Sequence, residues 1–188
     1  PAIGGVVSSA TGTVSLTAVP SGGWMLAVLV AAPGNGAPAT PSGWTSYGGT
    51  DFAMRVVGRV KQAGDTTLSG SWGFVSVMWG TGSAAASSWR SATGGMGSTS
   101  LSLSDTTAGS RLVTVAPSQP SFLESAGYAT GGAVTDHTKV AYGGSSWHCW
   151  WGAGTAAGGT TTATRSTPGN PSYIQYMGAW VLVEISGI

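Results

Sequence analysis

Apolar side chains in this chain occur in short runs, and Gly, Pro and Ser separate one run from the next. The longest run, residues 24–32, has nine residues, whereas a membrane-spanning helix needs about 20. Residues 14–18 alternate between apolar and polar side chains, the two-residue period of a half-buried strand. No segment keeps a helical period beyond one turn. The pattern therefore predicts an all-β fold with no membrane insertion.

Further strand patterns follow at short intervals. The continuous apolar run 24–30 predicts a strand that is covered on both faces, and residues 54–61 alternate. In the last strand, Glu184 lies on the face opposite Val181 and Val183, so we expect its side chain to point to solvent. The other predicted strands cover residues 74–79, 101–103, 112–115 and 173–185.

A weak internal repeat relates the two halves of the chain. Residues 16–33 and 103–117 each read as an apolar residue, a Thr/Ser/Gly turn and an apolar strand that ends in Ala-Pro. Residues 63–67 are echoed by 157–161. The offsets are similar, 87 and 94 residues, which fits two related four-strand units packed face to face.

These patterns predict a two-sheet antiparallel β-sandwich of jelly-roll-like topology. The length of 188 residues suits one domain, because sandwiches of this size commonly fold as single units. We expect one domain over 1–188, with pseudo-repeat halves at about 1–95 and 96–188. Each half alone would expose an apolar sheet face.

Charge is scarce: seven Lys or Arg and six Asp or Glu make 7% of the chain, and the net charge is +1. An ordinary domain has roughly 25% charged residues. There is no basic footprint of the kind that nucleic-acid binders carry, so no nucleic-acid partner is expected. The start, Pro1-Ala2-Ile3-Gly4-Gly5, lacks the basic and apolar regions of a signal peptide.

The sequence contains few candidate catalytic residues. Asp65 and Asp105 lie in Gly/Thr contexts typical of turns. Asp136 and His137 could belong to a triad with a serine, but neighbouring side chains of a strand point to opposite faces. The single cysteine, Cys149, is predicted to be a packed, inert thiol. We expect no enzyme activity, no metal and no cofactor.

The aromatic residues are the most informative feature. Nine Trp are present, and they allow two interpretations: core or subunit interface, or an exposed platform that stacks on sugars or anchors a protein partner. Trp72, Trp79 and Trp180 are predicted to be core, whereas Trp44 and Trp89 lie in Gly/Ser surroundings that favour exposure. The candidate ligand or interface contacts are Trp44, Trp89, Trp147, Trp150 and Trp151.

Several motifs together carry a resemblance. They are the apolar strand 24–30, Pro41-Ser42-Gly43-Trp44-Thr45, the segment 54–67 ending in Ala-Gly-Asp-Thr-Thr, and the closing strand 180–185. The series resembles β-sandwich modules in structural proteins of tailed bacteriophages, especially minor tail proteins of phages that infect actinobacteria. That family covers tail-tip, fibre and capsid-decorating roles. This chain departs from it in having no recognisable attachment helix or coiled coil.

The resemblance implies a non-enzymatic virion structural protein, above all a minor tail protein of the tail tip or fibre with a role in host attachment. Its partners would be other virion proteins, further copies of the chain (a trimer) and host cell-surface glycans, and its location the virion. Two alternatives stay open: a capsid decoration protein, and a carbohydrate-binding, lectin-like module. An enzyme is a distant third.

Overall fold

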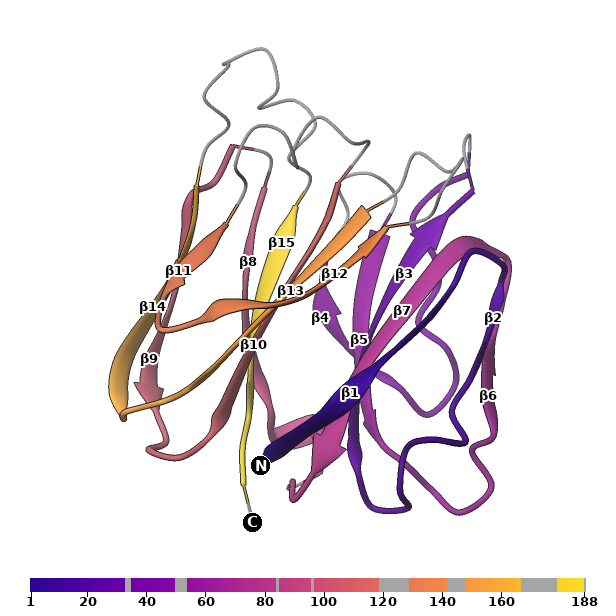
Figure 1. Cartoon of the computed structure of the whole chain (residues 1–188), viewed down its shortest axis with the longest axis horizontal. Helices are drawn as coiled ribbons and strands as arrows, with labels where there is room; N and C mark the ends of the chain where they lie inside the picture. The colour runs from indigo at the N-terminus through magenta and orange to yellow at the C-terminus, as the bar shows by residue number, and fades with distance from the viewer. Residues whose placement is uncertain are drawn as a thin grey trace.

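The computed structural model describes residues 1–32, 35–49, 54–83, 85–95, 97–118, 129–141, 148–166 and 179–187. Apart from a short 3₁₀ turn at Ala86–Ser88, the regular elements of this part of the chain are all β-strands (Figure 1). The strands are β1 (Ala2–Ser9), β2 (Thr13–Ser15), β3 (Trp24–Ala31), β4 (Thr45–Gly48), β5 (Met54–Val60), β6 (Thr67–Ser69), β7 (Trp72–Thr81), β8 (Arg90–Gly94), β9 (Ser100–Thr106), β10 (Arg111–Ser118), β11 (Thr130–Gly132), β12 (Thr135–Ala141), β13 (His148–Thr155), β14 (Gly159–Arg165) and β15 (Trp180–Ile185).

The strands form four sheets that stack as four layers (Figure 1). The inner N-terminal sheet has the order β1-β7-β3-β5-β4, and the inner C-terminal sheet has the order β12-β13-β10-β15-β8. A two-stranded outer N-terminal sheet, β2-β6, covers the first, and a three-stranded outer C-terminal sheet, β11-β14-β9, covers the second. All strand pairs are antiparallel. The predicted all-β antiparallel sandwich is confirmed, and the two small outer sheets add to the two sheets that were expected.

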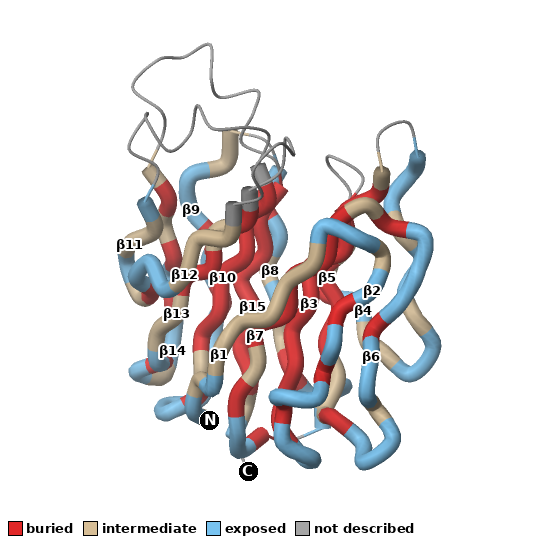
Figure 2. Tube along the Cα trace, turned by 45° about the vertical axis from the view of Figure 1, so that its right-hand side comes forward, coloured by how far each residue is buried: buried red, intermediate tan, exposed pale blue. Residues whose placement is uncertain are grey.

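Strand β3 explains why the longest apolar run is continuous. Leu26, Val28 and Val30 face the central core between the two inner sheets. Met25 and Leu29 face the other way, into the core beneath the outer N-terminal sheet. Every residue of β3 is buried (Figure 2), because both faces of the strand are covered. The strand therefore needs apolar side chains at odd and even positions alike.

Strand β15 has the same arrangement in the second half. Val181 and Val183 enter the central core, whereas Trp180 and Leu182 enter a third core beneath the outer C-terminal sheet. All six residues of the strand are buried. The molecule therefore has three apolar layers between four sheets, and the central layer takes side chains from both halves of the chain.

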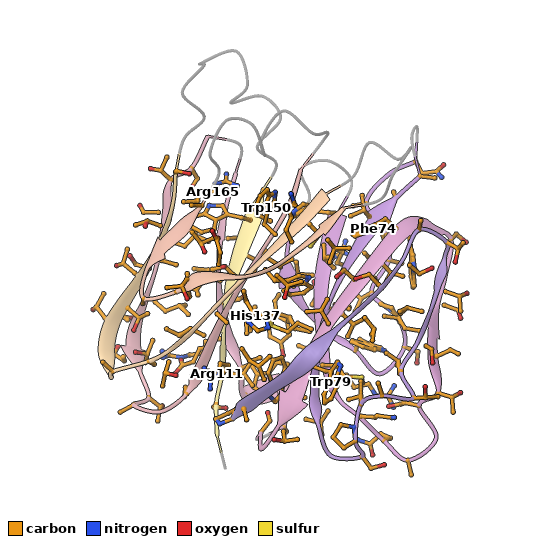
Figure 3. The ribbon with its side chains drawn as sticks, viewed as in Figure 1. Phe74, Trp79, Arg111, His137, Trp150 and Arg165 are labelled. Carbon is orange, nitrogen blue, oxygen red and sulfur yellow. The ribbon has the colours of Figure 1, made fainter. Side chains whose placement is uncertain are left out.

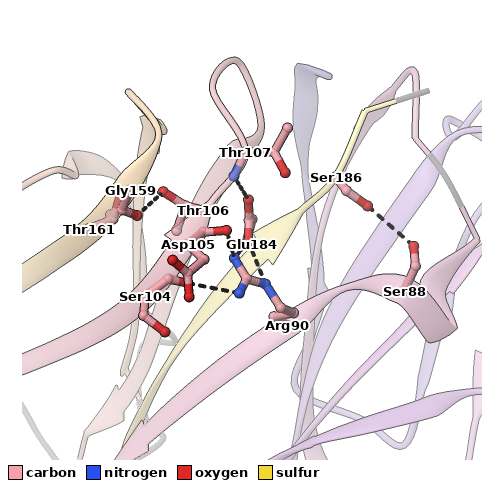
Figure 4. Close-up of polar contacts among 10 residues, drawn as sticks. All are labelled: Ser88, Arg90, Ser104, Asp105, Thr106, Thr107, Gly159, Thr161, Glu184 and Ser186. Atoms are coloured by element: carbon pink, nitrogen blue, oxygen red, sulfur yellow. Dashed lines mark hydrogen bonds and ion pairs between the residues drawn. The ribbon is translucent and has the colours of Figure 1, made fainter.

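Glu184 corrects the expectation for that strand. Its side chain is not on the solvent face: it is only 3% exposed, because the face of β15 opposite Val183 is covered by the outer C-terminal sheet. The carboxylate accepts hydrogen bonds from Arg90 Nε at 3.0 Å and from the backbone N–H of Thr107 at 2.6 Å (Figure 4). The sequence pattern identified the correct face but not the fourth layer of the fold.

The two halves of the chain pair their strands in the same order. The inner sheets read β1-β7-β3-β5-β4 and β8-β15-β10-β13-β12, and the outer pair β2-β6 has its counterpart in β9-β14. The jelly-roll topology, the sequence repeat and the single-domain boundary stay predictions. Within the described residues, no helix has the length and apolar character needed to cross a membrane.

Candidate functional site

The five candidate tryptophans lie in different environments, and Trp147 lies outside the described residues. Trp151 on β13 is 1% exposed and belongs to the central core. Its indole Nε1 donates a hydrogen bond of 2.9 Å to the hydroxyl of Ser76 on β7. Trp151 therefore joins the two inner sheets, and its ring is not available to a ligand.

Trp89 was predicted to be exposed, and the structure shows that it is buried. Its ring stacks on Tyr47 with 5.8 Å between the ring centroids, and its Nε1 donates to the Ser83 hydroxyl at 3.0 Å. Both rings fit over Gly58, where a Cβ would lie only 2.6 Å from the Trp89 ring. The Gly/Ser surroundings that suggested a surface position instead provide the space that the indole occupies.

Trp44, Trp79 and Trp150 are half-buried. The backbone N–H of Trp44 closes a turn by donating to the carbonyl of Pro41 at 3.1 Å, and the left-handed conformation of Gly43, with φ of 77°, suits that turn. Trp44 and Trp79 both pack against the core beneath the outer N-terminal sheet. Trp79 was predicted to be core and is instead partly open to solvent.

Trp150 lies on β13 next to the edge strand β12. The ammonium of Lys139 sits 5.1 Å from the centroid of its ring, within the range of a cation–π interaction. Trp150 and Trp79 lie towards opposite ends of the strands (Figure 3). Trp150 and Trp79 therefore do not form one platform.

A groove of about 350 Å³ lies beside the outer N-terminal sheet. Residues 38–42 form one wall, and Ser69, Ser71 and Trp72 form the other. None of the lining residues is charged, and Thr40, Ser42, Ser69 and Ser71 are exposed. Trp72 is 8% exposed, and its Nε1 is buried without a hydrogen-bond partner. The sequence reasoning placed Trp72 in the core and missed the groove.

Two of the carboxylates considered for catalysis hold local backbone. Asp136 accepts from the backbone N–H and the hydroxyl of Thr130, at 2.8 and 2.7 Å. His137 lies at an irregularity of the β12–β13 ladder and is exposed (Figure 3). Asp65 accepts from the backbone N–H of Gln62 at 2.8 Å and pairs with Arg59, so its predicted turn role is confirmed.

Within the described residues, Cys149 and Tyr47 have a pKa that burial raises. The Cys149 thiol is fully buried in the central core, as predicted, and its burial raises its pKa. Burial also raises the pKa of Tyr47, whose hydroxyl donates to the carbonyl of Ala86. Both groups are neutral at physiological pH. No group of three His, Cys, Asp or Glu residues that could hold a metal occurs within the described ranges.

Few charged residues are exposed in the part of the chain that the structure describes. Among the charged residues that the structure describes, only Asp105 and Asp136 are exposed, and the others are buried or half-buried. The buried ones hold backbone in place: Lys61, for example, donates to the carbonyls of Leu16 and Val19 at 2.7 and 2.5 Å. These charges therefore stabilise the fold.

Comparison of the chain with protein-family models, with curated proteins and with solved structures gave no match. The fold defines the class of the protein, an all-β sandwich with several antiparallel sheets. Its function has to be argued from the chemistry of its surfaces.

Proposed function

We propose that the chain is a non-enzymatic structural protein of a tailed-bacteriophage virion, most specifically a minor tail protein. The resemblance of its turn and strand motifs to such proteins provides the motivation. In this role the chain is a rigid building block, present in several copies, that contacts neighbouring virion proteins. Three copies around one axis are the expected arrangement, because closed symmetric oligomers are common in such assemblies.

The observation that carries the proposal is the chemistry of the two outer faces. Exposed residues of the outer N-terminal sheet include Thr13, Ser15, Thr67 and Ser69, and Thr13 Oγ1 donates to Ser69 Oγ at 3.2 Å. On the outer C-terminal sheet the exposed residues include Ser100, Ser102, Ser104 and Thr162. The hydroxyls of Ser102 and Thr162 are 2.8 Å apart. Both faces thus present rows of hydroxyls on paired strands.

Such faces suit burial between subunits. Removing an ion from water costs several kcal/mol even after relaxation, whereas a hydroxyl both donates and accepts hydrogen bonds and can exchange water for a partner. An ordinary soluble monomer instead spreads charges over its surface. The outer sheets therefore favour assembly with neighbours over a free existence in solution.

The motifs that carry the resemblance form turns that connect strands of this fold. The Pro41–Trp44 turn precedes β4, and the Gln62–Asp65 turn connects β5 to β6. Arg59 pairs with Asp65 at 3.2 Å, which ties the second turn to the end of β5. These residues shape the sandwich, so the motifs behind the resemblance support the fold itself, as expected of a structural module.

The decisive experiment is quantitative mass spectrometry of purified particles of the phage whose genome encodes the chain. We expect the chain in particles at a copy number that matches tail symmetry, and immunogold labelling on the tail. Labelling on the head at capsid copy number would favour capsid decoration instead. Absence of the chain from particles would overturn the proposal.

A series of charge insertions tests separately whether the two outer faces are assembly surfaces. Ser102→Glu places one carboxylate on the outer C-terminal face, and Thr13→Glu places one on the outer N-terminal face. Gln62→Glu, in an exposed turn, is the matched control. At least one of the two face variants should fold normally yet enter particles poorly, while the control enters normally. Normal incorporation of both face variants would show that neither face is an assembly surface.

A further inference from the structure

Trp72, which lines the groove between residues 38–42 and the start of β7, has a buried hydrogen-bond donor without an acceptor. Trp72 Nε1 is buried and has no acceptor, and a buried donor without a partner is unfavourable compared with one that is paired or hydrated. The other indoles with recorded contacts show the usual solution: Trp24 donates to the carbonyl of Ala2 at 3.1 Å and Trp151 to Ser76 at 2.9 Å. Trp72 has no such acceptor, and it forms part of the groove wall.

The position of the Trp72 ring is fixed by its own hairpin. A Cβ at Gly70 would lie 2.2 Å from the six-membered part of the indole, so that part of the ring lies directly over Gly70. The apolar body of the ring packs in the core beneath the outer N-terminal sheet. The opposite wall, residues 38–42, has no strand or helix. A ligand can reach the buried Nε1 only when that wall shifts outward, and the proposal requires this movement.

The remaining groups in the groove select the chemistry of the ligand. Thr40, Ser42, Ser69 and Ser71 each carry a hydroxyl, and each residue is exposed. Pro38 and Pro41 add apolar surface, and no lining residue carries a charge. A ligand that matches this wall is neutral, has many hydroxyls and ether oxygens, and presents one apolar face to an aromatic or proline ring.

We propose that this groove binds a neutral saccharide, with one of its oxygens accepting a hydrogen bond from Trp72 Nε1. The volume of about 350 Å³ is at the small end of the usual range for ligand pockets, which suits one or two sugar rings. An extended proline-rich peptide can also accept a hydrogen bond from an indole N–H, but it would leave most of the surrounding hydroxyls without a matching group. The saccharide is therefore the favoured occupant.

The proposal does not rest on a virion role, and the two fail separately. The copy number of the chain in particles tests the virion role, and saccharide binding by the purified full chain tests the groove proposal. The probes are an immobilised panel of neutral mono- and disaccharides, including hexoses, pentoses and N-acetylhexosamines, with decaproline as the peptide arm. The best saccharide is then titrated by calorimetry.

Trp72→Phe is the central variant, because it keeps an aromatic ring and removes only the indole N–H and part of the ring. It should weaken binding of the best saccharide about tenfold. It should lower the melting temperature only through the loss of buried ring volume, since the N–H that it removes has no partner in the free protein. Trp89→Phe is the matched control: it removes an N–H that Ser83 satisfies, and Trp89 is not a lining residue of the groove. It should lower stability and leave saccharide affinity unchanged.

If Trp72→Phe fails to fold, Ser71→Ala and Ser42→Ala take its place, because both residues are exposed and line the groove. Each should weaken saccharide binding roughly three- to tenfold, as expected for the loss of one hydrogen bond. The proposal is overturned if no neutral saccharide binds, if Trp72→Phe or both serine variants bind as the parent chain does, or if decaproline alone is captured.

Discussion

The guanidinium of Arg90 on β8 lies 2.6 Å from the carboxylate of Glu184 on the neighbouring strand β15. Arg90 also donates to the backbone carbonyls of Ser104 and Asp105 at 2.8 and 2.7 Å, and Glu184 accepts from the N–H of Thr107. One ion pair thus connects the inner C-terminal sheet to strand β9 of the outer C-terminal sheet and to the turn that follows it (Figure 4).

Glu184→Ala should therefore destabilise the protein by about 2–3 kcal/mol, because it removes charge-assisted hydrogen bonds and leaves Arg90 without its carboxylate. The value is below that of a fully buried pair because the Arg90 side chain is 41% exposed. Urea unfolding measures the change. Asp105→Asn, an exposed carboxylate nearby, is the control and should shift stability by less than about 0.5 kcal/mol. Equal effects of the two substitutions would contradict the prediction.

Lys61→Met should cost about 2 kcal/mol. The apolar stem is retained, but the carbonyls of Leu16 and Val19 lose the ammonium that both accept from. The Leu16 carbonyl keeps the backbone N–H of Val19 as a donor, so the main cost is the Val19 carbonyl, and a buried acceptor without a partner is unfavourable by about 1–3 kcal/mol. Lys139→Met, at a half-buried position over Trp150, should change stability by about 1 kcal/mol or less. The comparison of urea midpoints is decisive: a smaller loss for Lys61→Met than for Lys139→Met would sink this account.

Ser76→Ala should lower the free energy of unfolding by about 1–3 kcal/mol, the range for a buried donor left unpaired. The Ser76 hydroxyl accepts from Trp151 Nε1 and lies 2.8 Å from the hydroxyl of Ser8. Near-ultraviolet circular dichroism should report a changed environment for an indole. Ser102→Ala, at an exposed position, is the control and should leave both stability and spectrum nearly unchanged.

Stability should fall with rising pH from about pH 9 upward. The thiol of Cys149 and the hydroxyl of Tyr47 have ordinary pKa values of 9.0 and 10.0, and burial raises both in the folded state. Above these ordinary values the unfolded chain loses protons that the folded chain retains, so unfolding becomes more favourable as pH rises. Below pH 8 neither group contributes a pH dependence.

Urea midpoints between pH 7 and pH 10.5 measure this loss. Cys149→Val should make the pH dependence between pH 9 and 10 shallower, and Tyr47→Phe should do so above pH 10. An unchanged slope in both variants would assign the alkaline loss to other groups.

The sequence pattern predicts the strands well where burial is symmetrical. The run of residues 24–30 requires a strand covered on both faces, and β3 confirms it, because every residue of that strand meets one of two cores. The alternating pattern gave the wrong exposure for Glu184, because both faces of its strand are covered as well. A polar residue in a strand usually marks the solvent face, but here it marks a buried ion pair with a residue 94 positions away in the chain.

The surroundings of single aromatic residues were less predictable. Small neighbours around Trp89 suggested exposure, yet Gly58, more than thirty residues earlier, provides the space in which the ring is buried. The groove at Trp72 depends likewise on residues 38–42, which are remote in sequence. The residues next to Trp89 and Trp72 in the sequence predict neither the contact with Gly58 nor the groove, because both arise from the way the sheets stack. For the same reason, the sequence showed that charges are few but not that most of them support backbone.

The four-layer stack gives the molecule an uneven resistance to opening. The outer N-terminal sheet consists of two strands of three residues each, and it is the only sheet above the Met25 and Leu29 face of β3 among the described strands. Its backbone amides can separate from one another without breaking the central core. In a hydrogen–deuterium exchange experiment, amides of β2 and β6 should therefore exchange by local opening, while those of β3, β10 and β15 exchange only when the whole molecule unfolds.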